Sequence, residues 1–166
     1  MRINAFVFLA LSSAGLLVLG CGDDSGNGDC PDGEILCDGE CIEACGVSEV
    51  ECDCVCIPEF EPTLADIQTN VFDVSCAASS CHDSQAPAAD LNLSSVEASE
   101  TNLIDVDSVQ VDKVRVAPGD LEASYLFDKL TNTDIAADTT PMPQGGFPLC
   151  DAKLLSVEAW IAEGAN

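Results

Sequence analysis

The sequence predicts a mainly α-helical domain preceded by a small, disulfide-rich, irregular segment. Apolar residues follow helical spacing in residues 63–75 and again in 151–163, which indicates two amphipathic helices. Seven of the 11 cysteines lie between Cys30 and Cys56, where too few apolar residues are present to form a hydrophobic core. We therefore expect disulfides to hold this segment and side-chain packing to hold the helical part.

The first 20 residues are typical of an export signal. Arg2 supplies the positive start, and the apolar run that follows is too short for a transmembrane helix. Val18-Leu19-Gly20-Cys21 resembles the lipobox of bacterial lipoproteins, which implies cleavage before Cys21 and lipid attached to it. We expect an exported protein, lipid-anchored in the bacterial cell envelope on the periplasmic or outer-membrane side. An ordinary secretory signal with a chance cysteine is the alternative.

A flexible tether of Gly, Ser, Asn and Asp spans residues 21–29, and the cysteine-rich segment spans 30–56. With Cys21 set aside for lipid and Cys76 and Cys81 for another role, eight cysteines remain. Eight allow four disulfides, in about 105 possible pairings. The count stays even if Cys76 pairs with Cys81. The spacing would also suit zinc or copper(I), but an oxidising compartment favours disulfides.

A proline-bracketed linker, 57–62, precedes the helical domain, 63–166. Thr63 is the predicted N-cap of a helix that runs into Cys76, with Asp66 three residues on. Residues 87–102 are predicted to be irregular, and their apolar side chains to face inward: Leu91, Leu93 and Val96. Apolar and polar residues alternate over 103–116, which indicates extended structure.

Asp120 follows a Pro-Gly turn and is predicted to cap a helix over 121–130. A loop rich in Thr, Pro and Gly covers 132–148. The last helix is predicted over 151–163, with Gly164 as its stop and four inward residues: Leu154, Val157, Trp160 and Ile161. Cys150 stands where a capping Ser or Thr is usual. We expect it to tie this helix to the cysteine-rich segment or to a neighbouring loop.

The stretch Cys76-Ala-Ala-Ser-Ser-Cys81-His82 carries the clearest chemistry. Thiols beside an imidazole suit covalent haem attachment, in which the cysteines form thioethers and the histidine takes an axial position on the iron. His82 is the only histidine in the chain. Four residues separate the cysteines, where two are usual. The alternative is a local Cys76–Cys81 disulfide with His82 as an ordinary surface residue.

Met142 is the second candidate iron ligand. It is the only methionine after the signal, and it lies in a loop between Pro141 and Pro143. Proline fixes φ and stiffens such a loop, which suits a presented ligand better than a core filler. A thioether is a soft ligand that raises the reduction potential of haem iron. The sequence therefore predicts a site for one covalent haem c with His82 and Met142 as metal ligands.

These motifs stand in an order that resembles a class I monohaem cytochrome c domain, as in envelope lipoproteins of myxobacteria and planctomycetes. The resemblance covers about 62–166 and includes five further stretches: Val71-Phe72, Arg115-Val-Ala-Pro-Gly-Asp120, Ser124-Tyr125-Leu126, Lys129-Leu130 and Trp160-Ile161-Ala-Glu-Gly164-Ala165. It implies three helices around one haem, held by Cys76, Cys81, His82 and Met142.

The resemblance also implies finer contacts. The first helix should cross the last, so that Phe72 meets Trp160. A backbone carbonyl, with Pro87 as the candidate, should accept a hydrogen bond from the His82 ring. Arg115 and Tyr125 should reach the haem propionates, with a surface ion pair as the alternative for Arg115.

Charge limits the partners. After the signal the chain has 30 acidic and 4 basic residues, a formal charge of −26. Such a surface repels nucleic acid and anionic head groups and favours redox partners with a basic face. No second histidine is available as base for a Ser or Cys nucleophile. An iron with both His82 and Met142 as ligands should pass electrons rather than bind substrate, so we expect an electron carrier and not an enzyme. A haem-free, disulfide-stapled surface lipoprotein that binds a protein partner or a metal is the alternative.

Overall fold

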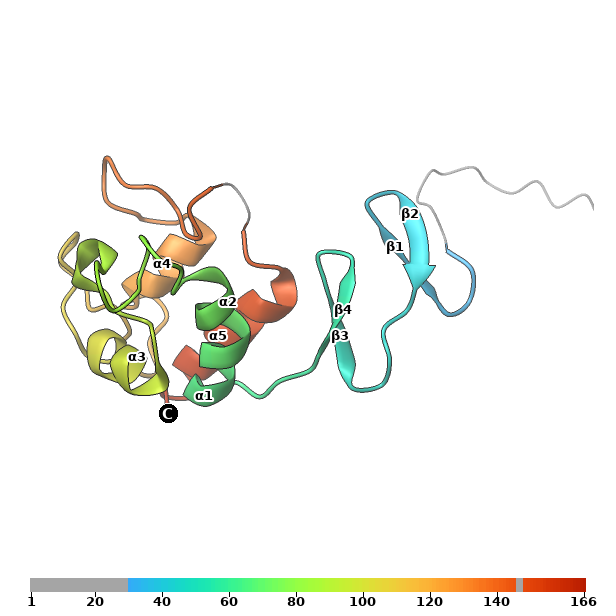
Figure 1. Ribbon diagram of the computed structural model, residues 1–166, viewed down its shortest axis with the longest axis horizontal. Coiled ribbons are helices and arrows are strands. Elements are labelled where there is room, and N and C mark those ends of the chain that lie inside the picture. Colours follow the sequence, from blue (N-terminus) through green and yellow to red (C-terminus); the bar gives the residue numbers. More distant parts are fainter. Residues whose placement is uncertain (1–29, 146–147) are drawn as a thin grey trace, which may run out of the picture.

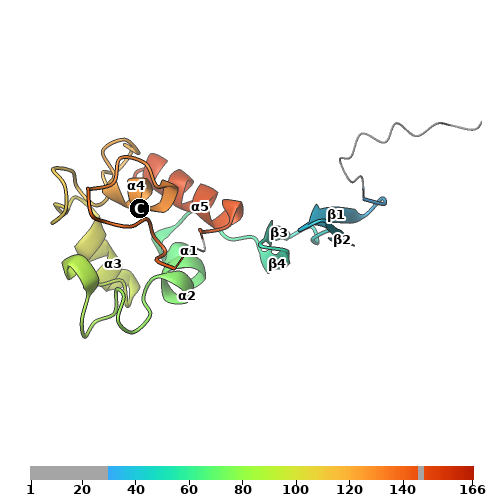
Figure 2. The same ribbon diagram turned by 90° about the horizontal axis from the view of Figure 1, so that it is seen from above.

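The computed structural model describes residues 30–145 and 148–166, which form a helical domain and an arm of two β-hairpins (Figure 1). We call residues 30–58 the hairpin arm. Seen from above, the arm extends from one side of the helical domain (Figure 2). The predicted signal, the tether and the lipidation site at Cys21 lie outside the described residues.

The hairpin arm is regular where the sequence predicted an irregular segment. Strand β1 (Glu34–Cys37) pairs with β2 (Glu40–Glu43), and β3 (Glu49–Cys52) pairs with β4 (Val55–Pro58), both antiparallel. Each hairpin turns on two residues with positive φ, Asp38-Gly39 and Asp53-Cys54. This conformation matches the twist of the flanking strands. Strand β4 ends at Pro58, inside the range predicted as linker.

Disulfides hold the arm, as predicted. Cys30–Cys41 and Cys45–Cys56 lie within it, and Cys37–Cys54 joins its two hairpins. The fourth disulfide, Cys52–Cys150, ties β3 to the start of the last helix, which decides between the two predicted partners of that helix. All eight predicted sulfurs are thus paired and unavailable as thiolate ligands. Four disulfides are typical of an oxidising, extracytoplasmic compartment.

The first helical stretch begins at its predicted cap, where the Thr63 hydroxyl accepts a hydrogen bond from the Asp66 backbone N–H at 3.3 Å. It is continuous through α1 (Leu64–Ile67), a π-helical turn η1 (Gln68–Phe72) and α2 (Asp73–Ser75). Its buried apolar residues are Leu64, Ile67, Val71 and Phe72.

Helix α3 (Val96–Leu103) occupies a range predicted to be irregular. Its N-cap is Ser95, whose hydroxyl accepts from the Ala98 N–H at 3.2 Å. Only Ser99 and Leu103 are buried on it, so the sequence shows no apolar periodicity there. Leu93 is buried as predicted, whereas Val96 is 40% exposed and that prediction is wrong.

Residues 104–116 form isolated bridges, Ile104 with Val116 and Asp107 with Val114, so the predicted extended structure is only partly present. Helix α4 (Tyr125–Thr131) begins four residues later than predicted. Asp120 caps a preceding turn instead, accepting from the Ala123 N–H at 3.0 Å. Helix α5 (Asp151–Ala162) matches its prediction, and Gly164 follows it at φ 103°.

The core lies where the first helical stretch meets α5 (Figure 1). Phe72 and Trp160, each 1% exposed, belong to the same buried cluster, together with the fully buried Val157. The described part of the chain therefore contains four helical stretches rather than three, because α3 joins the predicted set. Among the described residues, no helix has the length and apolar character needed to cross a membrane.

Candidate functional site

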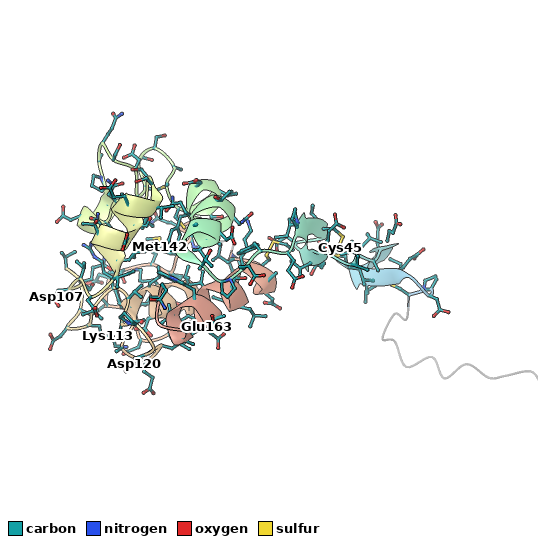
Figure 3. The ribbon with its side chains drawn as sticks, turned by 90° about the horizontal axis from the view of Figure 1, so that it is seen from below. Cys45, Asp107, Lys113, Asp120, Met142 and Glu163 are labelled. Atoms are coloured by element: carbon teal, nitrogen blue, oxygen red, sulfur yellow. A yellow bond between two sulfur atoms is a disulfide. The ribbon has the colours of Figure 1, made fainter. Side chains whose placement is uncertain are left out.

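A cavity of about 240 Å³ opens in the helical domain, and Met142 on its wall is labelled in Figure 3. It is bounded by the end of α2, a short 3-10 turn η2 (Ala88–Asp90), the 108–110 loop, α4 and residues 142–144. Its lining includes all six predicted haem-contacting residues: Cys76, Cys81, His82, Arg115, Tyr125 and Met142. The fold thus brings together side chains that are up to 66 positions apart in the sequence.

The loop between the two cysteines is closed by backbone hydrogen bonds. The Cys81 N–H donates to the Ala78 carbonyl at 2.9 Å, and the His82 N–H donates to the Cys76 carbonyl at 3.2 Å. The second bond folds the chain back, so that both cysteines and His82 line the same cavity despite the wide spacing. Neither Cys76 nor Cys81 is in a disulfide, which excludes the local pair from this structure.

The His82 ring is oriented by a backbone carbonyl. Its Nδ1 lies 3.1 Å from the Leu91 oxygen. A carbonyl only accepts, so Nδ1 carries the proton and Nε2 keeps its lone pair. Burial lowers the pKa of His82, so the ring is neutral near pH 7. The prediction that the Pro87 carbonyl accepts this hydrogen bond is therefore wrong.

The Pro87 carbonyl is engaged elsewhere, because it accepts the Asp90 N–H at 3.2 Å within turn η2. That turn carries the chain past the imidazole, and the Leu91 carbonyl that follows it lies 3.1 Å from the ring nitrogen.

Burial raises the pKa of Cys76 to about 12, and the neighbouring Cys81 adds to the shift. The Cys76 thiol is therefore protonated at neutral pH. A zinc or copper site needs thiolates, which this environment disfavours. A neutral thioether at the same place would have no charge to desolvate, so the pocket suits an alkylated sulfur better than a metal-bound one.

Met142 is fixed to the wall of the cavity by its own backbone. Its N–H donates to the Lys129 carbonyl at 2.8 Å, which fastens the loop to the end of α4. The side chain is half-buried and packs against the hydrophobic core. The soft sulfur is therefore held at the cavity and not left on a free loop.

Two buried cations face the same cavity, Arg115 at 8% exposure and Lys129 at 7%. The Arg115 guanidinium donates to the Asn102 and Ala89 carbonyls, at 2.8 and 3.0 Å. The Lys129 ammonium donates to the Thr140 carbonyl and lies 5.9 Å from the centre of the Tyr125 ring. Within the described residues, neither forms an ion pair with a carboxylate, so the surface ion pair considered for Arg115 is absent.

These cations leave positive charge in a cavity of a strongly acidic protein. Burial lowers the pKa of Arg115, because removing the charged guanidinium from water is unfavourable. The nearby Asp90 carboxylate partly offsets this shift. A buried charge is costly unless it is paired. The cavity is therefore suited to a ligand that brings its own carboxylates.

Sequence reasoning quoted Lys129 as part of a resembling stretch but gave it no role in the site, although one signal for such a role was present. It follows Tyr125 by four residues on α4, which places the two on one helix face. Tyr125 also lines the cavity, but its hydroxyl oxygen accepts from the Ala136 N–H at 3.1 Å and so anchors the segment that follows α4.

The donor set fits a haem: an imidazole with a free Nε2, a thioether, two unpaired thiols, two cations and apolar walls. Those walls include Leu91, Leu93, Leu103, Leu126 and Leu130. Comparisons of the chain with protein-family models, with curated proteins and with solved structures find no match. The chemistry of the site therefore rests on its residues alone.

Proposed function

We propose that this protein is a monohaem c-type cytochrome that carries single electrons at the bacterial cell envelope. One observation carries the proposal: a single cavity collects the Cys76–Cys81–His82 motif, the one methionine after the signal and two buried cations without carboxylate partners. Each feature alone has a structural explanation. Their meeting around one cavity matches the needs of a ligand with an iron, two vinyl groups and two propionates.

Different cavity residues would hold different parts of a haem. A bound haem would supply an iron that exchanges one electron between its ferrous and ferric states. His82 offers Nε2, and Met142 offers a soft sulfur that favours the ferrous state. Cys76 and Cys81 would each add S–H across a vinyl double bond, so that one carbon–sulfur bond forms and the hydrogen goes to the neighbouring carbon. Arg115 and Lys129 would balance the propionates, and the leucines exclude water.

A haem held by both His82 and Met142 would have no open iron position for a substrate, so we assign a carrier role and not an enzymatic one. Four disulfides favour an extracytoplasmic location. With the predicted lipid at Cys21, the protein is membrane-anchored at the envelope. Its excess of acidic residues suits redox partners with a basic face.

Intact mass tests the proposal on the full chain, expressed in a host that exports proteins and attaches haem. We expect a mass gain of one whole haem, retained after acid-acetone extraction, and a peroxidase-type haem stain on a denaturing gel. The Cys76→Ser/Cys81→Ser variant should lose the stain. The matched control Cys30→Ser/Cys41→Ser removes two cysteines from the distant arm and should keep it. Exported protein with its four disulfides formed and no covalent haem would contradict the proposal.

A further inference from the structure

Gln68 is a buried polar side chain, 3% exposed, whose hydrogen-bonding groups are all engaged. Its amide nitrogen donates to the Leu93 carbonyl at 2.8 Å and to the Asp73 carboxylate. Its amide oxygen accepts from the Ser99 hydroxyl at 2.6 Å. A flipped amide would set its oxygen against two acceptor oxygens, so the network fixes the orientation.

The π-helical turn explains why Gln68 and Asp73 can meet. The Asp73 N–H bonds to the Gln68 carbonyl, five residues back, so these residues stand one above the other. In an α-helix the same pair would point in different directions. Single π turns recur at functional sites, and this one aims an amide at the segment that carries Leu91 and Leu93.

The 91–93 segment holds His82 at two points. The Leu93 N–H donates to the His82 carbonyl at 2.8 Å, and the Leu91 carbonyl accepts from the His82 ring at 3.1 Å. Leu93 is 1% exposed and its carbonyl is the acceptor that Gln68 reaches. The amide thus joins the first helical stretch to the segment that orients the imidazole.

We propose that Gln68 is a positioning residue for His82, acting through the 91–93 segment. By fixing the Leu93 carbonyl it keeps the Leu91 carbonyl against Nδ1–H, which sets the tautomer and the direction of Nε2. This orientation of the ring follows from the hydrogen bonds at Leu91 and Leu93. Its consequence for the iron rests on the proposed haem: a carbonyl that accepts a hydrogen bond from Nδ1–H makes the imidazole a stronger donor, which favours the ferric state.

The test substitutes Gln68→Met, which keeps the length of the side chain and removes its hydrogen bonds. The matched control is Asn70→Leu, two residues on, where the lost amide donates to the helix's own Asp66 carbonyl at 2.9 Å and not to the 91–93 segment. Far-ultraviolet circular dichroism checks folding. If Gln68→Met does not fold, Ser99→Ala takes its place, because it removes only the bond to the Gln68 oxygen.

The first readout is the exchange rate of the His82 Nδ1 proton, measured by nitrogen-15 NMR on the protein as purified. His82 is the only histidine, so its signals are unambiguous. We expect exchange about tenfold faster in Gln68→Met, less in Ser99→Ala, and wild-type exchange in Asn70→Leu. Wild-type exchange in folded Gln68→Met, or in Ser99→Ala where that variant stands in, overturns the inference.

The second readout is the reduction potential of haem-loaded protein. Weakening the hydrogen bond to Leu91 should raise the reduction potential, and with it the ferrous-to-ferric ratio by several-fold. A tenfold change in that ratio corresponds to about 59 mV. If haem-loaded Gln68→Met and Asn70→Leu have the same reduction potential, Gln68 has no influence on the iron through His82. A chain without haem defeats the proposed function only, because the proton exchange still decides whether Gln68 positions His82.

Discussion

The sulfurs of Cys52 and Cys150 form a disulfide between strand β3 and the residue that precedes α5. The two cysteines are 98 positions apart, whereas the three disulfides within the arm span 11 to 17. Both are buried, at 7% and 8% exposure. This one bond closes the segment that carries Cys76, His82 and Met142 of the cavity into a covalent ring.

Opening that ring should cost the most stability of any disulfide in the protein. A cross-link restricts the unfolded chain more when it closes a longer loop, so we expect Cys52→Ser/Cys150→Ser to lower the free energy of unfolding of the helical domain by about 3–5 kcal/mol. Chemical denaturation followed by Trp160 fluorescence measures it. Cys30→Ser/Cys41→Ser is the control and should leave that transition unchanged. Equal losses in both variants would contradict the prediction.

The two free thiols should differ in reactivity in protein exported without haem attachment. Cys81 is exposed, while burial holds the pKa of Cys76 at about 12. Thiolates, and not thiols, attack the carbon of iodoacetamide and displace iodide, so at pH 8 the reagent should modify Cys81 and spare Cys76. Cys76 should react as the pH approaches 12, or in denaturant. Peptide mass mapping reads both sites, and equal modification at pH 8 would contradict the burial of Cys76. In haem-loaded protein neither sulfur should react.

Lys129, which is buried, and Lys113, which pairs with the buried Asp128, offer two tests of buried charge. Lys113 lies 2.8 Å from the buried Asp128 carboxylate, whereas Lys129 meets only a backbone carbonyl and a ring. Lys113→Met leaves the buried Asp128 carboxylate without its lysine partner. It should lower the unfolding free energy by about 1–3 kcal/mol with or without haem.

Lys129→Met should instead depend on haem. In the Cys76→Ser/Cys81→Ser background it removes a costly unpaired cation and should be neutral or stabilising. In haem-loaded protein it removes a partner of the propionates and should be destabilising by about 1–3 kcal/mol. Thermal unfolding is measured with Lys129 and with Lys129→Met, each in haem-loaded protein and in the Cys76→Ser/Cys81→Ser background. The same sign in both backgrounds would contradict an anionic ligand at Lys129.

Met142→Leu should leave the haem attached and lower its reduction potential. The thioether favours the ferrous state, and leucine cannot coordinate iron. Potentiometric titration measures the shift, and a haem stain confirms attachment. Met142 also packs on the core, and leucine conserves its volume, so we expect less than about 1.5 kcal/mol of destabilisation. An unchanged potential would exclude Met142 as an iron ligand.

Local signals were enough to predict part of this structure. The Thr63 cap and the spacing of apolar residues located the first and last helices, because both signals lie within a few residues of the element they define. The segment of α3 was wrongly predicted to be irregular for a different reason. Helix α3 buries only Ser99 and Leu103, so what holds it is contact with residues distant in sequence and not its own periodicity.

The sequence by itself determined which chemistry is present: a lone histidine after two cysteines, a methionine between two prolines, and eight further cysteines in even number. Only the tertiary structure decided how these groups are held. It paired Cys52 with Cys150, placed the Leu91 carbonyl rather than that of Pro87 on the His82 ring, and buried Lys129 at the cavity. Residue type is a local property, whereas burial and hydrogen-bond partners arise from segments that meet only when the chain folds.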